Sequence, residues 1–200
     1  MGRRGDHSFE ELSKMILDAA YDILEEEGYT KLSTRKIATK IGYTVGTLYN
    51  VFQNLDDIFV HINGRTLDKL IEHLNVAVAK DSKENKIKLL AQAYIDFSKE
   101  NFNIWSTLFE YRFEEGHQIP KWYNEKVNNL YGVVEKSIRP LLSPKHQAEV
   151  KEIITVLWSG IHGICILSIK GKLDRTGVES ASVLVDHFLT NYMNGVGLSK

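Results

Sequence analysis

The stretch from Ser33 to Phe52 limits the fold of this 200-residue chain more than any other part of the sequence. A small residue, Ala38, is followed four positions later by Gly42, and the apolar Leu48 comes six positions after the glycine. This spacing suits two short helices that cross closely around a sharp turn, with Thr44 as the N-terminal cap of the second helix. An ordinary corner between two helices needs no more than the alanine and the glycine, so the charges nearby decide between the two interpretations.

The segment from residue 28 to residue 55 is basic and contains no acidic residue before Asp56. Its charged residues are Lys31, Arg35, Lys36 and Lys40. Because the whole chain has a net charge of −1, the positive charge is concentrated locally. Positive charge beside two paired helices favours contact with phosphates, and the stretch predicts a DNA-binding helix-turn-helix.

Composition narrows the class of protein. A hydrophobic fraction of 43% is ample for a folded core, and the single Cys165 cannot form an internal disulfide. The N-terminus lacks the apolar segment of a signal peptide. The longest apolar stretch, residues 160–169, has about half of the ~20 residues that a membrane span needs. These features predict a soluble, cytoplasmic protein with no membrane contact.

Helical periodicity of the apolar residues predicts an all-α fold of about nine helices. Ser8 and Glu11 form a capping box for the first helix, and Thr176 and Glu179 form one for the last. Pro120 and Pro144 each suit the first turn of a helix. We expect residues 1–53 to form a DNA-binding domain, and residues 54–200 to form a helical domain for effector binding and dimerisation.

Four segments in the first third of the chain resemble the DNA-binding head of TetR-family transcriptional regulators. They are Leu17–Ala20, Glu27–Tyr29, Ser33–Ala38 and Gly42–Phe52, and the match covers roughly residues 10–60 without a gap. More weakly, Trp158–Gly163 resembles the Trp-His-Gly signature of one C-terminal ligand-domain subgroup. The resemblance implies an all-α homodimer, in most cases a repressor, whose heads leave a double-stranded operator when the larger domain binds a small effector.

The helix-turn-helix and the resemblance together assign the DNA contacts. The predicted DNA-binding residues are Ser33, Thr34, Arg35, Thr44, Val45, Thr47, Tyr49 and Asn50. The first three offer donors to phosphate at the start of a helix, and the other five lie on a recognition helix over residues 44–50. Gly46 would allow close approach to the DNA backbone, whereas Leu48 and Phe52 are expected in the core.

Two positions depart from the family pattern. Val45 and Leu55 are apolar where the family often has lysine. Fewer cations predict a shallower salt dependence of DNA binding. We therefore expect weaker non-specific binding than is typical of the family, or a larger contribution from Arg3 and Arg4. The alternative for these two arginines is a solvated terminus without DNA contact.

The larger domain contains aromatic residues that favour a mostly apolar effector. The predicted ligand-binding residues are Trp105, Phe109, Trp122, Tyr123, Trp158 and His162. Each aromatic residue is also compatible with an ordinary core position, and His162 with a structural hydrogen bond. Helices near residues 144–170 and 177–194 are expected to form the homodimer, because Ser159, Gly160 and Gly163 make a small-residue surface. Burial of that surface within one subunit is the alternative.

Two other functions compete with DNA binding. A helical adaptor could use the head for protein contacts. An enzyme would need catalytic residues, but the histidines show no metal-ligand spacing, and Cys165 lies in an apolar helix. The sequence therefore predicts no catalytic residue, no metal site and no cofactor. A metal-responsive regulator is a remaining alternative, although the sequence shows no site for the metal.

Overall fold

The computed structural model describes residues 7–79, 86–173, 177 and 180–196. Over these residues it has nine α-helices, three 3₁₀ segments and no strand, which confirms the all-α prediction. The chain divides into two compact units. The head unit comprises residues 1–68 and 101–126, and the body unit comprises residues 69–100 and 127–200.

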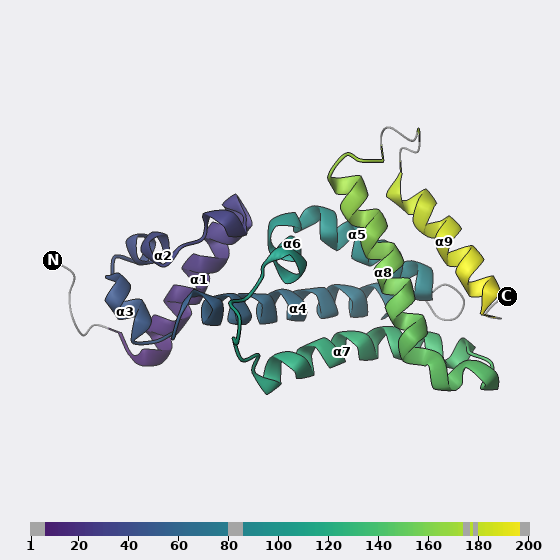
Figure 1. Ribbon diagram of the computed structural model, residues 1–200, viewed down its shortest axis with the longest axis horizontal. Helices are drawn as coiled ribbons and strands as arrows, with labels where there is room; N and C mark the ends of the chain where they lie inside the picture. The colour runs from purple at the N-terminus through teal and green to yellow at the C-terminus, as the bar shows by residue number, and fades with distance from the viewer. Residues whose placement is uncertain (1–6, 80–85, 174–176, 178–179, 197–200) are drawn as a thin grey trace. The chain divides into compact units, whose positions relative to one another are not determined.

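The head unit holds the helix-turn-helix and more of the chain than the predicted segment 1–53. It contains α1 (Phe9–Glu27), the 3₁₀ segment η1 (Tyr29–Lys31), α2 (Thr34–Ile41), α3 (Val45–Tyr49), the first part of α4 (Leu55–Ala79), α6 (Phe102–Glu110) and the start of α7 (Lys121–Ile138). Helix α1 packs against both α2 and α6 (Figure 1). Ile104 of α6 is fully buried in the same core as Leu24, Ile37 and Leu48. Whether residues 1–53 act as a domain by themselves stays a prediction.

Local sequence rules set the helix boundaries in the head unit. The Ser8 hydroxyl accepts from the Glu11 N–H at 3.2 Å, and the Ser8 N–H donates to the Glu11 carboxylate at 2.7 Å. The predicted capping box is therefore present. Gly42 ends α2 with φ of 74°, a left-handed conformation that a residue with a Cβ adopts only at a cost. The turn between α2 and α3 depends on this glycine.

The body unit is a second helical core. It contains the remainder of α4 and α7, α5 (Lys86–Glu100), the 3₁₀ segments η2 (Arg139–Leu141) and η3 (Pro144–Glu149), α8 (Val150–Ile169) and α9 (Ala181–Gly195). Helix α8 lies beside α9 and also contacts α5 (Figure 1). The ring of Phe188 on α9 packs onto Gly160, where an added Cβ would lie 2.4 Å from the ring. Part of the small-residue surface is thus used within one subunit.

The start of the eighth helix was predicted wrongly. Pro144 begins the 3₁₀ segment η3 rather than an α-helix, and α8 starts only at Val150. The second capping box, Thr176 and Glu179, lies outside the described residues, and α9 begins at Ala181. Pro120 immediately precedes α7, close to the predicted position.

Candidate functional site

The predicted recognition helix is the five-residue α3. Thr44 caps it by accepting the Thr47 N–H at 3.3 Å, and the two threonine hydroxyls lie 3.0 Å apart. Leu48 is fully buried and holds the helix on the head core, whereas Tyr49 is 51% exposed. Thr44, Tyr49 and Asn50 are exposed, so α3 and its caps offer hydroxyl and amide groups of the kind that bind base edges and phosphates.

The N-terminus of α2 supplies the second group of predicted DNA contacts. The Ser33 hydroxyl accepts the Lys36 N–H at 3.3 Å, so Ser33 is the N-cap of this helix. Arg35 is exposed, and Thr34 is half-buried. The two helix starts place all eight predicted DNA-binding residues on α2, α3 and their caps, but DNA contact by each residue stays a prediction.

Two of the four cations in the basic segment have acidic partners on α1. Lys36 pairs with Glu27, and the Lys40 ammonium lies 3.1 Å from the Asp22 carboxylate. Arg35 forms no ion pair within the described residues. The sequence analysis missed these pairs because the partners are far apart along the chain. The basic segment, residues 28–55, therefore has less uncompensated positive charge than its own residues indicate.

The apolar departures at Val45 and Leu55 have a structural explanation. Both side chains are partly buried against the head core. A lysine at either position would have to leave that contact to reach a phosphate. Hydrophobic packing at these two positions thus replaces the cations that the family often has there.

A contact between the N-terminal residues and the turn was not predicted. The Nδ1 atom of His7 lies 2.6 Å from the phenol oxygen of Tyr43, and the two rings meet edge to face. Tyr43 directly precedes Thr44, the cap of α3. Arg3 and Arg4 lie outside the described residues, so their DNA contact stays a prediction.

The body unit contains a partly open apolar cavity of about 60 Å³. Its walls come from α4, α5, α7 and α8, and they are formed by Leu74, Ile87, Leu90, Ala91, Tyr94, Val134, Ile138, Ile154, Leu157, Trp158 and Ile161. Among the residues that the structure describes, none in the wall is a lysine, arginine, aspartate or glutamate. Such a cavity suits an uncharged, apolar group.

One hydrogen-bonded chain of side chains lies at the cavity. The Trp158 indole N–H donates to the Tyr94 phenol oxygen at 3.3 Å, and that oxygen lies 2.9 Å from Nδ1 of His162. The indole N–H can only donate, whereas the direction of the hydrogen bond between Tyr94 and His162 depends on which ring nitrogen of the histidine carries its hydrogen. The sequence analysis singled out Trp158 and His162 but missed Tyr94, which is 68 residues away from His162.

The other predicted ligand-binding residues lie in the head unit and not in the cavity wall. Trp105 is fully buried, with Phe109 at its edge 5.4 Å away between ring centres. The ring of Trp122 covers Gly64, and Tyr123 meets Trp122 edge to face. Of the six predicted residues, only Trp158 forms part of the cavity wall, and His162 is hydrogen-bonded to the wall residue Tyr94. Ligand contact by each of them stays a prediction.

Cys165 is 1% exposed in α8, and burial raises the pKa of its thiol to about 11. The thiol is therefore protonated at neutral pH, which is typical of a structural cysteine. Among the described residues, no three His, Cys, Asp or Glu side chains gather closely enough to hold a metal ion.

Residues 16–62 match the family described as bacterial regulatory proteins, tetR family, and residues 87–192 match the tetracyclin repressor-like C-terminal domain. The chain is 25% identical over 185 residues to the uncharacterized HTH-type transcriptional regulator YobS of Bacillus subtilis, over 90% of this chain and 92% of that protein.

Two solved structures share the fold. A TetR-family transcriptional regulator from Streptomyces coelicolor aligns with a TM-score of 0.63 and 19% identity, over 92% of this chain and 98% of that one. The transcriptional regulator FadR from Bacillus subtilis, solved in complex with stearoyl-CoA, aligns with a TM-score of 0.57 and 17% identity, over 92% and 99%. The subgroup indicated by Trp158–Gly163 stays a prediction. The C-terminal match alone spans more than half of the chain, so the protein belongs to the TetR family and is a DNA-binding transcriptional regulator.

Proposed function

We propose that this regulator is a cytoplasmic homodimeric repressor that leaves a palindromic operator when a small, uncharged, apolar effector enters the body-unit cavity. The chemistry of the cavity wall supports this effector class, because the described wall residues are apolar apart from the Tyr94 hydroxyl and the Trp158 indole N–H. An ionised ligand group would lose its hydration there without gaining an opposite charge. A hydroxyl or carbonyl group could instead exchange hydrogen bonds with the chain of Trp158, Tyr94 and His162.

The size of the cavity adds a requirement. Ligand pockets commonly measure roughly 300–1,000 Å³, whereas this cavity is about 60 Å³. An effector larger than a few heavy atoms must therefore widen it by moving side chains such as Trp158. The fold shared with FadR, a protein solved with stearoyl-CoA, is compatible with a long apolar effector. Stearoyl-CoA is the ligand in the FadR structure. Of its parts, the apolar acyl chain is the one that suits the apolar cavity described above.

A thermal-shift series of straight-chain alcohols from hexanol to dodecanol tests the effector class. A ligand at 100 times its Kd stabilises the folded state by about 2.7 kcal/mol. Ala91→Val narrows the cavity and should reduce the stabilisation, whereas Ala93→Val makes the same change on α5 at a buried position outside the wall. Equal alcohol-induced shifts in both variants would contradict binding in this cavity.

Selection from a random-sequence pool of duplexes tests for an operator of any sequence. The wild-type protein is used to select the duplexes at moderate salt. We expect enrichment of a palindrome, because a two-fold dimer presents two recognition helices to two half-sites. The selected operator should be released by the alcohols that raise the melting temperature. Stabilisation without release would contradict the proposed repressor mechanism.

The proposed dimer uses the outer faces of α8 and α9. Val156 and Leu167 on α8 and Val183 on α9 are each about half exposed. The most apolar 18-residue window of the helical stretch Pro144–Ile169 has a mean hydropathy of 1.7, and 28% of that window is buried within the chain. By length and composition it could also cross a membrane. A second copy of the chain is a better partner for this apolar face than a membrane, because α8 also packs on α5 and α9 of its own subunit.

A further inference from the structure

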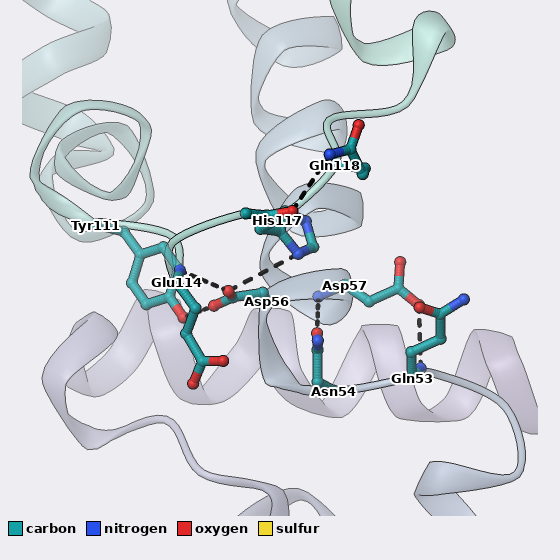
Figure 2. Close-up of polar contacts among 9 residues, drawn as sticks. Gln53, Asn54, Asp56, Asp57, Tyr111, Glu114, His117 and Gln118 are labelled. Atoms are coloured by element: carbon teal, nitrogen blue, oxygen red, sulfur yellow. Dashed lines mark hydrogen bonds and ion pairs between the residues drawn. The ribbon is translucent and has the colours of Figure 1, made fainter.

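A buried carboxylate joins the start of α4 to the segment that follows α6. The Asp56 side chain is 4% exposed, and it accepts hydrogen bonds from the Tyr111 hydroxyl and from the Glu114 N–H at 2.8 Å. Nδ1 of His117 lies 3.8 Å from the same carboxylate (Figure 2). These three partners all come from residues 111–117, which we call the anchor segment.

The anchor segment is held by ring packing as well as by the carboxylate. The Tyr111 ring stacks on Phe59 of α4, with ring centres 3.6 Å apart. Phe113 is partly buried against the head core and stacks on His117. Burial and the neighbouring Asp56 carboxylate raise the pKa of Tyr111, so the phenol keeps its hydrogen and donates it. A buried carboxylate without such donors would be strongly unfavourable, so the contact favours one conformation.

The position of Asp56 connects this contact to the recognition helix. Helix α3 ends at Tyr49, and α4 begins at Leu55. Hydrogen bonds hold the short connection between them (Figure 2). The Gln53 N–H donates to the Asp57 carboxylate at 3.2 Å, and the Asp57 N–H donates to the Asn54 side-chain oxygen at 2.9 Å. Phe52 within it is 4% exposed. A displacement of Asp56 would therefore be passed to α3 through a short, well-packed connection.

We propose that Asp56 is a positioning residue for operator recognition, and that the anchor segment holds the connection from α3 to α4 in the DNA-binding arrangement. The inference rests on the operator binding proposed above. Recognition of base edges requires accurate placement of α3, whereas non-specific attraction to phosphates does not. Loss of the anchor should thus weaken specific binding and leave non-specific binding unchanged.

The test compares Asp56→Asn, Tyr111→Phe and the matched control Asp68→Asn in the full chain, with the selected operator and a scrambled duplex. Asp56→Asn should weaken operator binding about tenfold or more, since a hydrogen bond to a charged group is lost. The affinity of Asp56→Asn for the scrambled duplex should stay within about twofold of the wild type. Both affinities of Asp68→Asn should also stay within about twofold, because this variant removes the same charge from an exposed position further along α4, away from the connection to α3. Tyr111→Phe removes the hydroxyl that donates to Asp56 but keeps the ring on Phe59. It therefore tests the contact of the anchor segment with Asp56 even if Asp56→Asn does not fold.

Two further readouts separate positioning from simple destabilisation. By linkage, operator binding should slow hydrogen exchange in residues 111–117 of the wild type, and Asp56→Asn should abolish this effect. The double variant should lose less operator affinity than the sum of the single variants, because both remove one contact. Folded variants with wild-type operator affinity, or exchange that is insensitive to the operator, would overturn the role of Asp56. Failure of the wild type to select any duplex would instead remove the proposed operator binding itself.

Discussion

At the scale of single residues, Gly46 is a position where we expect DNA binding, but not the fold, to require a glycine. An added Cβ at this position would meet only the Thr44 hydroxyl, at an ordinary 3.7 Å. Gly46→Ala should therefore leave the free energy of unfolding unchanged or raise it by roughly 0.5–1 kcal/mol, because alanine is the better helix former. If α3 approaches the DNA backbone closely, operator affinity should fall about tenfold. Denaturant unfolding and operator titration of the same sample measure both effects, and unchanged affinity would place Gly46 away from the DNA.

Gly42 gives the opposite expectation. Its φ of 74° is left-handed, although an added Cβ would meet no atom within 4 Å. Gly42→Ala should lower the free energy of unfolding by about 1–2 kcal/mol through backbone strain alone. Urea unfolding measures the loss, with Gly132→Ala as a control, since Gly132 has no atom within 4 Å of an added Cβ and lies in a helix. A loss no larger than that of the control would mean that the turn does not need a glycine.

The residues that sequence reasoning placed correctly are those whose roles depend on near neighbours. The caps Ser8 and Thr44 and the turn at Gly42 each involve partners within a few positions, where local rules apply. The pair of Glu27 and Lys36 spans nine positions, and the contact of Asp56 with Tyr111 spans 55. No local pattern distinguishes such partners from solvated charges, so only the packed structure identifies them.

At the scale of elements, α2 tests how the head uses its positive charge. Arg35 forms no ion pair within the described residues, whereas Lys36 pairs with Glu27. Each neutralised phosphate contributes about −0.9 to the slope of log K against log salt. Arg35→Ala should therefore make the slope shallower by about 0.9 per head, and Lys36→Ala should change it less. Operator titrations at several salt concentrations measure the slopes. Because both variants remove one positive charge from the same helix, equal changes would mean that the ion pair with Glu27 opens on DNA.

At the scale of elements, apolar periodicity predicted the helices from the sequence, but it did not indicate which unit each helix joins. Nine helices follow from apolar spacing, because that pattern is repeated along each helix. The aromatic residues of the effector prediction were grouped by chemistry, but α6 and the start of α7 belong to the head unit. Trp105 and Trp122 consequently pack on head residues, and Trp158 alone reaches the cavity wall. Which unit an element joins depends on contacts between distant segments, which periodicity does not encode.

At the scale of the whole molecule, the proposed dimer is expected to determine operator affinity by joining two heads. Two linked heads bind two half-sites with a high effective concentration, so loss of the dimer weakens binding far more than loss of one contact. The exposed apolar residues of α8 and α9 are the proposed interface, with Val156 and Leu167 both 45% exposed. A charge at these positions would be buried in the interface without a partner.

We therefore expect Val156→Glu combined with Leu167→Glu to sediment as a monomer at micromolar concentration in detergent-free buffer, and to lose operator affinity by about a hundredfold or more. The control is Val76→Glu, since Val76 is 51% exposed on α4 and lies outside the proposed interface. It should remain a dimer and bind the operator normally. If the double variant is still a dimer, the interface does not use this face of α8. If the wild type is a monomer, the outer face of α8 contacts something other than a second copy of the chain.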